Sequence, residues 1–187
     1  MRIVGGRFRG KHLTPVGQGD ESAHLRPTTD RVRESLFNVL AHNKWEFQID
    51  GARVLDLFAG TGALGLEALS RGASFVLFVE NGNTARALIR QNIDVLKAIG
   101  PTKLFRRDAT NMGAAKGVPF DLVFLDPPYG TGLGEKALRS AADGKWLSDG
   151  ALIIWEDNAD QIAPAGFTHL DARRYGETSI TILRYDG

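Results

Sequence analysis

The side chains best suited to chemistry close an apolar run in the middle of the chain. Residues 120–129 read FDLVFLDPPY, so the run ends in an acid, two prolines and an aromatic residue. Proline has no amide hydrogen and a fixed φ, so it cannot continue a central strand. The run therefore predicts a buried strand that stops at a rigid corner, with the carboxylate of Asp126 and the ring of Tyr129 at its end.

This corner suits a reaction at an amine conjugated to a ring. The lone pair of such an amine is delocalised, so its nitrogen is a poor nucleophile until an acceptor beside the N–H bonds localises it. Asp126 offers one acceptor, and the carbonyl of Pro127, aimed by its fixed φ, offers another. Beyond Pro128, Tyr129 offers a face on which an unstacked base can lie. Catalysis here would rest on positioning and electrostatics. A turn that merely ends the strand is the alternative.

A glycine-rich loop directly follows an earlier apolar run. Residues 56–65 read DLFAGTGALG, in which Gly60, Gly62 and Gly65 match the pattern GxGxxG. Glycines let a backbone turn sharply and approach a ligand closely. The pattern alone is weak evidence, because a tight strand-to-helix turn without a ligand also produces it.

Acids at the ends of the next two strands strengthen the interpretation of the loop. Glu80 follows Gly60 by 20 residues, where a carboxylate can accept hydrogen bonds from both hydroxyls of a ribose. Asp108 is expected to end the third strand, where it or Ala109 could meet an adenine edge. The loop and the acids together predict a ligand that contains adenosine.

Asp56 discriminates between two such ligands, NAD and S-adenosylmethionine. It lies within the apolar run, four residues before Gly60, and a buried carboxylate is costly without compensation. The cationic methionine end of S-adenosylmethionine supplies compensation, whereas the pyrophosphate of NAD would be repelled. Asp56 therefore favours S-adenosylmethionine.

An alternation of strands and helices positions these side chains. A helix is expected to begin at Thr29 or Asp30, either of which can cap it, and to line one face with Val32, Leu36, Val39 and Leu40. Strands are expected at 51–57, 74–79, 103–107, 121–126, 150–156, 167–173 and 178–185, with further helices at 62–71, 83–98 and 134–142. This order predicts a Rossmann-like α/β fold, with a mostly parallel seven-stranded sheet and an antiparallel C-terminal hairpin.

The first part of the chain differs in character. Residues 1–15 are expected to form short strands or a hairpin, and residues 1–12 contain Arg2, Arg7, Arg9 and Lys11 but no acid. Such a basic arm suits a phosphate backbone, although an ordinary solvated terminus has the same composition. We divide the chain into an N-terminal arm and loop at 1–28 and a catalytic domain at 29–187.

Composition narrows the classes of protein further. The 187 residues include no cysteine, which excludes disulfides and thiolate catalysis. The opening residues lack the apolar core of a signal peptide, and no run of about 18 apolar residues occurs. The four histidines are scattered without metal-binding spacing. We therefore expect a cytoplasmic protein without a membrane span or a metal.

Four stretches together resemble one family. They are MRIVGGRFRGKHL at 1–13, LRPTTDRVRESLFNVL at 25–40, VLDLFAGTGALGLEALSRGA at 54–73, and FDLVFLDPPY. These stretches are similar to those of the bacterial 16S ribosomal RNA guanine-N2 methyltransferases, which are class I enzymes dependent on S-adenosylmethionine. The resemblance covers nearly the whole chain and is more specific than either generic motif.

The resemblance implies methyl transfer to N2 of one guanine, in a hairpin loop near the decoding region, within a partly assembled small subunit. It implies cofactor contacts from Asp56, Phe58, Gly60, Thr61, Gly62, Glu80, Asn81, Asp108 and Ala109. It makes Asp126, Pro127, Pro128 and Tyr129 the corner that binds the amine. It makes Arg7, Arg9, Lys11, Arg26, Thr28 and Thr29 contacts to the RNA. We expect a monomer, because an enzyme that reaches into a ribosomal particle has no evident need of a partner subunit.

Two stretches depart from the family pattern. Glu80-Asn81 is followed by Gly82-Asn83, an unusual helix opening that concerns the outer adenosine contacts. The stretch at 155–158, WEDN, is atypical for the end of the fifth strand, so Glu156 is given no catalytic role.

Other functions remain open at this point. Related corners methylate adenine N6 in DNA or RNA, or the amide of a protein glutamine, although DNA enzymes usually carry a target-recognition region for which this chain has little room. A non-catalytic module that binds S-adenosylmethionine or RNA would not need an intact corner. An NAD oxidoreductase would need a proton donor near the glycine loop, and none is obvious.

Overall fold

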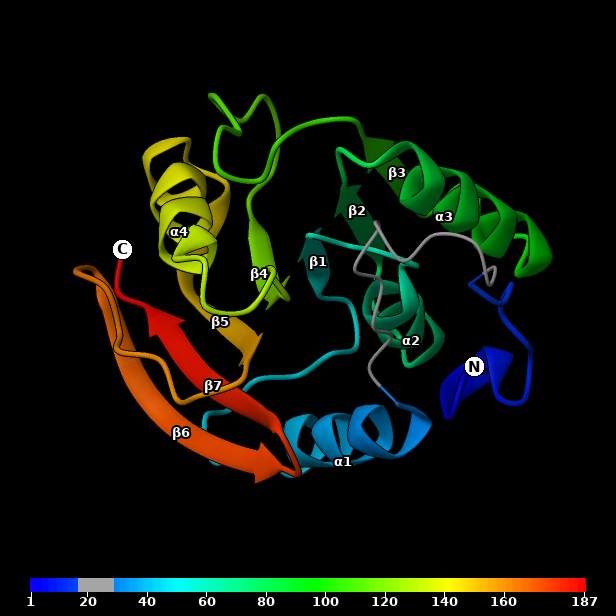
Figure 1. Ribbon diagram of the computed structural model, residues 1–187, viewed down its shortest axis with the longest axis horizontal. Coiled ribbons are helices and arrows are strands. Elements are labelled where there is room, and N and C mark those ends of the chain that lie inside the picture. The colour runs from blue at the N-terminus through cyan, green and yellow to red at the C-terminus, as the bar shows by residue number, and fades with distance from the viewer. Residues whose placement is uncertain (17–28) are drawn as a thin grey trace.

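The computed structural model describes residues 1–16 and 29–187, which form three layers around a seven-stranded sheet (Figure 1). The strands are β1 (Arg53–Leu57), β2 (Phe75–Val79), β3 (Thr102–Phe105), β4 (Phe120–Leu125), β5 (Leu147–Asp157), β6 (Phe167–Tyr175) and β7 (Thr178–Tyr185). Their order in the sheet is β3-β2-β1-β4-β5-β7-β6. The first five strands run parallel, and β7 pairs antiparallel with both β5 and β6. The predicted fold class is confirmed, including the C-terminal hairpin.

Within residues 1–16 and 29–187, four α-helices cover the two faces of the sheet. They are α1 (Asp30–Ala41), α2 (Ala63–Ser70), α3 (Asn83–Val95) and α4 (Leu133–Asp143). The first three share a core cluster with Val54, Phe124 and Ile154 on one face. Helix α4 packs with Leu55 and Val123 on the other face. Because side chains alternate along a strand, continuous apolar strands fill both cores at once.

Helix α1 begins where its cap was predicted, since the hydroxyl of Thr29 accepts a hydrogen bond of 3.3 Å from the backbone N–H of Val32. Its buried face is only partly the predicted one. Leu36 and Leu40 are buried, whereas Val32 and Val39 are only partly so. The buried face instead includes Arg33, described below, and Phe37, whose ring lies 5.7 Å from that of Phe124.

The N-terminal segment forms less strand than expected. Its pairing is a single antiparallel bridge between Arg2 and His12, with a 3-10 turn, η1 (Gly6–Phe8), between them. The backbone N–H groups of Val4 and Gly5 both donate to the carboxylate of Glu67 on α2, at 2.8 Å each. These N–H groups are therefore not available to a longer strand pairing.

Within the residues that the structure describes, no helix combines the length and apolar character needed to cross a membrane.

Candidate active site

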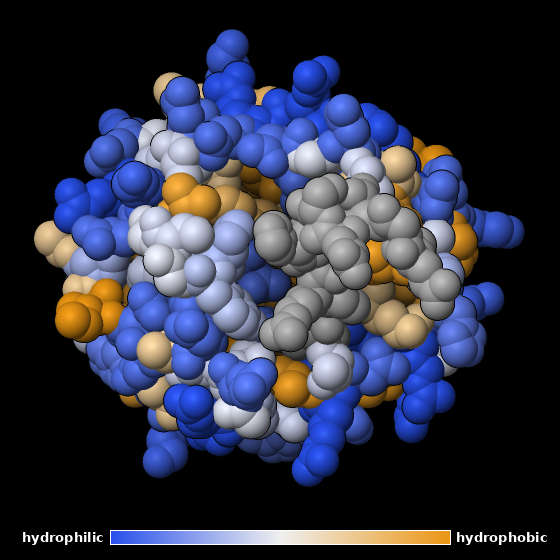
Figure 2. Space-filling view, viewed as in Figure 1, coloured by the Kyte–Doolittle hydropathy of each residue, from blue (hydrophilic) through white to orange (hydrophobic). Residues whose placement is uncertain are grey.

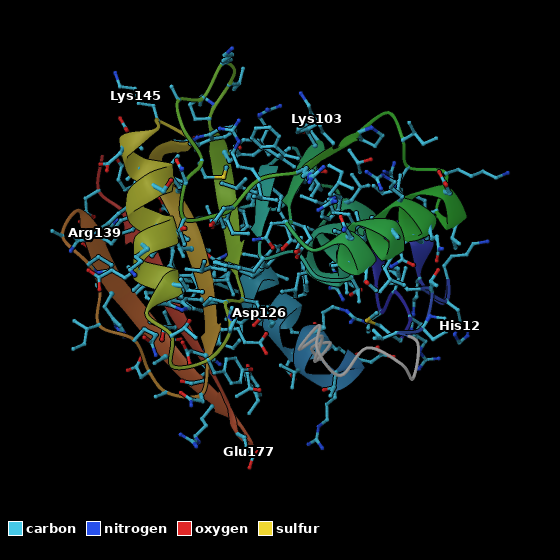
Figure 3. All side chains as sticks on the ribbon, turned by 45° about the horizontal axis from the view of Figure 1, so that its top comes forward. His12, Lys103, Asp126, Arg139, Lys145 and Glu177 are labelled. Atoms are coloured by element: carbon cyan, nitrogen blue, oxygen red, sulfur yellow. The ribbon has the colours of Figure 1, made fainter. Side chains whose placement is uncertain are left out.

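The carboxyl ends of β1 and β4 lie side by side at the centre of the sheet. From β1 the chain turns to α2 on one face, and from β4 it turns to α4 on the other, so the two connections diverge. Open α/β sheets bind ligands at such a divergence. The backbone N–H of Asp126 donates to the carbonyl of Leu57 at 3.5 Å, which joins the proline corner to the start of the glycine loop. Figure 3 labels Asp126 near the middle of the molecule, where β4 ends beside α1.

The glycine loop adopts the backbone that its sequence predicts. Gly62 caps α2 with a φ of 75°, in the left-handed region that glycine tolerates. Gly65 has no room for a side chain, because a Cβ there would lie 2.6 Å from the Phe78 ring and 2.9 Å from Oδ2 of Asp56. Phe58, which is not a glycine, also has a positive φ of 57°. Strained backbone of this kind is concentrated at functional sites.

Glu80 fastens this loop from the neighbouring strand. Its Oε2 accepts a hydrogen bond of 3.0 Å from the N–H of Gly60, and its Oε1 accepts one of 2.7 Å from the N–H of Gly82. Each carboxylate oxygen has two lone pairs, so both retain acceptor capacity. The carboxylate is therefore held in a fixed orientation and can still receive the two hydroxyls of a ribose.

Asp56 is buried beneath the loop and accepts a hydrogen bond of 3.0 Å from the N–H of Gly65. Burial raises its pKa to about 8, and the negative charge of Glu80 adds to the rise, while the Gly65 bond opposes it. A carboxyl with this pKa is stabilised in its charged form when a cation approaches.

Two carboxylates meet at the corner itself. The last pair in register between β4 and β5 is Leu125 with Trp155, so Asp126 and Glu156 follow it on neighbouring strands. Asp126 remains partly exposed as a residue, yet burial of its carboxyl, and next the charge of Glu156, raise its pKa well above the usual range. The side chains of neighbouring residues in register point to the same face. The two acids therefore form a close pair.

Tyr129 completes the corner. Its hydroxyl donates to Oε1 of Glu156 at 3.2 Å, and the residue is 37% exposed. Burial and the charge of Glu156 raise the pKa of Tyr129, so the hydroxyl keeps its proton. The ring is thus fixed at one end and retains an exposed surface.

Glu156 is the residue whose place in the site our sequence interpretation missed. The sequence alone gives it no catalytic role, because WEDN departs from the family pattern. The sequence did contain a signal, because alternation along LIIWE puts Glu156 on the same face as Ile154. In the sheet this position follows the pair Leu125 and Trp155, next to the acid that ends β4.

Asp108 lies differently from its prediction. Strand β3 ends at Phe105, so Asp108 stands in the following loop, exposed, where its Oδ1 accepts hydrogen bonds of 2.8 Å from the N–H and the hydroxyl of Thr110. The strand stops early because its partner β2 ends at Val79. Ala109 is buried, and Asn81 is exposed.

Thr61 connects the glycine loop to the N-terminal segment through the buried side chain of Asn92. The Asn92 amide donates to the Thr61 carbonyl at 2.9 Å, and its oxygen accepts a hydrogen bond of 2.7 Å from the N–H of Thr14. Loop and arm are therefore held by one side chain.

The residues expected to contact RNA are not all gathered at the corner. Arg7, Arg9 and Lys11 are exposed on the N-terminal segment, which packs against α2. Arg26 and Thr28 lie outside the described residues. Thr29 is exposed at the start of α1, with its hydroxyl engaged as the cap.

The residues at this edge fit a cationic adenosine ligand. Asp56, Glu80, Asp126 and Glu156 gather carboxyl groups where the parallel strands end, and the approach of a cation favours their ionised forms. A pyrophosphate would be repelled there, whereas a sulfonium is attracted. Figure 2 shows the surface hollowed near the middle of this view, with hydrophilic side chains at its floor. The described residues contain no group of acids and histidines arranged for a metal ion.

Comparison with known proteins agrees with this chemistry. A family model described as "Conserved hypothetical protein 95" matches residues 1–184. Ribosomal RNA small subunit methyltransferase D of Escherichia coli is 43% identical over 164 residues, which cover 88% of this chain and 78% of the relative. The putative rRNA methyltransferase YlbH of Bacillus subtilis is 32% identical over 193 residues, the full length of both chains.

A solved structure of the putative methyltransferase yhhF from Escherichia coli is also similar. It has a TM-score of 0.83 and 38% sequence identity, and the match covers 100% of this chain and 98% of that one. The glycine loop, the proline corner and the N-terminal segment all lie within the family-model match and within the full-length match to YlbH. The chain belongs to this family, of which the Escherichia coli ribosomal RNA small subunit methyltransferase D is a relative.

Proposed function

We propose that this protein transfers a methyl group from S-adenosylmethionine to the exocyclic N2 amine of one guanine in 16S ribosomal RNA. The observation that carries the proposal is the contact between the two motifs. The Asp126 N–H meets the Leu57 carbonyl, so an amine held at the corner lies next to a ligand held by the glycine loop. The names of the relatives support ribosomal RNA as the substrate.

When bound, S-adenosylmethionine supplies a methyl group on a sulfonium: the amine lone pair forms the N–C bond, the C–S electron pair stays on sulfur, and the nitrogen becomes cationic. The chain then has three tasks. Glu80 holds the ribose, Asp126 and the Pro127 carbonyl orient the N–H bonds, and Tyr129 supports the base. The proton leaves the cationic nitrogen for the carboxylates of the corner and then for water.

The RNA side of the proposal rests on the basic arm. We propose that residues 1–28 form an RNA-binding extension of the domain at 29–187, with Arg7, Arg9 and Lys11 on phosphates and Arg26, Thr28 and Thr29 nearer the target base. The substrate would be an assembled or partly assembled small subunit, which places the enzyme in the cytoplasm, where we expect it to act as a monomer.

Radiolabelled methyl transfer tests this function. Small ribosomal subunits lacking the modification, and naked 16S rRNA, would be incubated with labelled S-adenosylmethionine, and the product nucleoside identified by mass. N2-methylguanosine at one position is the expected product, with more label on the subunits. Label on adenine, or none on either substrate while S-adenosylmethionine still binds, would refute the proposal. Asp126→Asn protein is the control for enzyme-dependent label.

A further inference from the structure

The corner presents acceptor groups in a row. Asp126 and Glu156 follow the paired residues Leu125 and Trp155 on neighbouring strands, so their side chains extend from the same face of the sheet, about 5 Å apart at the backbone. The Tyr129 hydroxyl, 3.2 Å from Oε1, fixes one oxygen of Glu156. The two oxygens of a carboxylate carry four lone pairs, so this one bond does not exhaust the acceptor capacity of Glu156.

The charges around this pair are of one sign. Burial, and after it the charges of Glu156, Asp56 and Asp157, raise the pKa of Asp126. Like charges so close oppose the ionisation of Asp126, and the oxygens of both carboxyl groups can accept hydrogen bonds. The pair therefore matches a ligand edge that offers donors and does not offer another acceptor.

Nucleic-acid bases differ in this respect. Guanine presents N1–H and the N2 amine as adjacent donors. Adenine presents its N6 amine beside N1, which is an acceptor, and cytosine presents its N4 amine beside the acceptor N3. Only the guanine edge can donate to two neighbouring carboxyl groups, so a paired acid beside the amine-binding acid would distinguish the bases.

We propose that Glu156 is a specificity-determining residue, which accepts the N1–H of guanine while Asp126 accepts an N2–H. This inference rests on the proposed function and deepens it, because it names the side chain that selects the base. Tyr129 then has two roles, since its ring supports the base and its hydroxyl orients Glu156.

The setting of Glu156 supports a functional role. It is 5% exposed, within a strand whose neighbouring residue is Trp155 and opposite Ile180 on β7. A buried acid next to another acid costs stability, and an apolar residue would pack there without that cost. A substrate N–H group that donates to these carboxyl groups would offset this cost, which gives Glu156 a reason to be an acid.

The experiment replaces the target guanine by 2-aminopurine, which keeps the amine but has an acceptor at N1. Small subunits would be reconstituted with 16S rRNA carrying either base at the position that labelling identifies. We expect wild-type protein to prefer guanine by about 10- to 100-fold in kcat/KM. In Glu156→Gln the amide can rotate and donate to N1, so the preference should shrink to a few-fold.

Two further variants keep the test decisive. Asp157→Asn removes a buried charge from the same end of β5 and should leave the preference unchanged. Tyr129→Phe keeps the ring but removes the hydroxyl that holds Glu156, so it should reduce the preference for guanine to an intermediate value. This variant tests the role of Glu156 if Glu156→Gln is poorly folded.

The outcomes separate the two proposals. If wild-type protein methylates guanine and Glu156→Gln keeps the full preference, Glu156 does not select the base, and the proposed function stands. An equal loss of preference in Asp157→Asn would assign the effect to general charge and overturn the inference. If wild-type protein labels neither base, the proposed function fails and the inference fails with it.

Discussion

Burial of its carboxyl, and next the neighbouring acids, oppose the ionisation of Asp126 in the folded protein. Residues placed for catalysis often destabilise the fold that holds them, because activity requires charge where packing alone would not place it. Stability and activity should therefore respond in opposite directions when such a residue is neutralised.

We expect Asp126→Asn to lower methyl transfer by about 100- to 10,000-fold and to raise the melting temperature. The substitution replaces the charged acceptor for the amine by a neutral amide, whose oxygen accepts more weakly, and it also removes the repulsion from Glu156. Binding of S-adenosylmethionine, measured by calorimetry, should stay within a few-fold of wild type. Near-normal turnover would disprove the assignment of the corner.

Asp121 provides a matched control at the opposite end of β4. Its carboxylate accepts hydrogen bonds of 2.9 Å from the N–H of Arg53 and from the hydroxyl of Ser148. Asp121→Asn should lower the free energy of unfolding by about 1 kcal/mol while turnover is unchanged. A loss of turnover there would show that Asp126→Asn acts through the strand as a whole.

The pKa of Asp56 predicts a pH dependence of stability. Its pKa rises from 3.8 to about 8 on folding, so between these values the folded protein holds a proton that the unfolded chain releases. The free energy of unfolding should therefore fall as pH rises through this window and level off above it. Asp56→Asn should lack this contribution, so urea unfolding of both proteins across the window should give a steeper fall for wild type. Parallel curves would contradict the raised pKa.

At the scale of elements, α2 joins the N-terminal segment to α1 through one carboxylate. Glu67, whose side chain is fully buried, accepts from the N–H groups of Val4 and Gly5 and pairs with Arg71 at 2.8 Å and with Arg33 at 3.5 Å. The Arg33 side chain is also fully buried and reaches Asp30. The buried carboxylate of Glu67 and the buried guanidinium of Arg33 therefore each have a partner of opposite charge.

We expect Glu67→Ala to lower the free energy of unfolding by about 3 to 5 kcal/mol, because it leaves a buried guanidinium without this partner. Urea denaturation measures the loss. Glu135→Ala is the control, since it breaks an ion pair of the same i,i+4 type with Arg139 on α4, where both side chains are exposed. That change should cost less than about 1 kcal/mol, and equal losses would contradict the role of burial.

The sequence was sufficient to predict the order of strands and helices, because apolar strands and glycine turns are local signals. It was also sufficient to place Asp126 beside the glycine loop, since parallel strands end at one edge. It was not sufficient for Glu67 and Arg33. Charged residues within helices usually face solvent, and only the fold brings these two together. Asp108 was misplaced for a similar reason, because the end of an edge strand depends on its neighbour.

At the scale of the whole molecule, a net charge of +1 conceals an uneven distribution. Carboxylates gather where the parallel strands end, while Arg7, Arg9 and Lys11 are exposed on the N-terminal segment. Phosphates are attracted to such a cationic segment and repelled by the acidic edge, so the two regions can orient an RNA with only its target base at the corner.

Changing both Arg7 and Arg9 to Ala should weaken RNA binding and reduce the slope of log affinity against log salt by about 1.4 to 1.8. The control is Lys103→Ala with Lys145→Ala. These exposed lysines lie near the amino ends of β3 and β5, far from His12 on the arm (Figure 3). Binding titrations at several salt concentrations measure both slopes. Equal slopes in the two double variants would show that the arm contacts no phosphate.

The bridge that Asn92 makes between Thr61 and Thr14 has a consequence for the order of events. A ligand that restrains the glycine loop would also restrain Thr14 on the N-terminal segment through Asn92, and restraint of Thr14 would act on the loop in the same way. If S-adenosylmethionine raises the affinity for RNA by some factor, linkage requires that RNA raise the affinity for S-adenosylmethionine by the same factor. Methyl donor and ribosomal particle would then retain one another until transfer, and the loss of positive charge from the donor would release both.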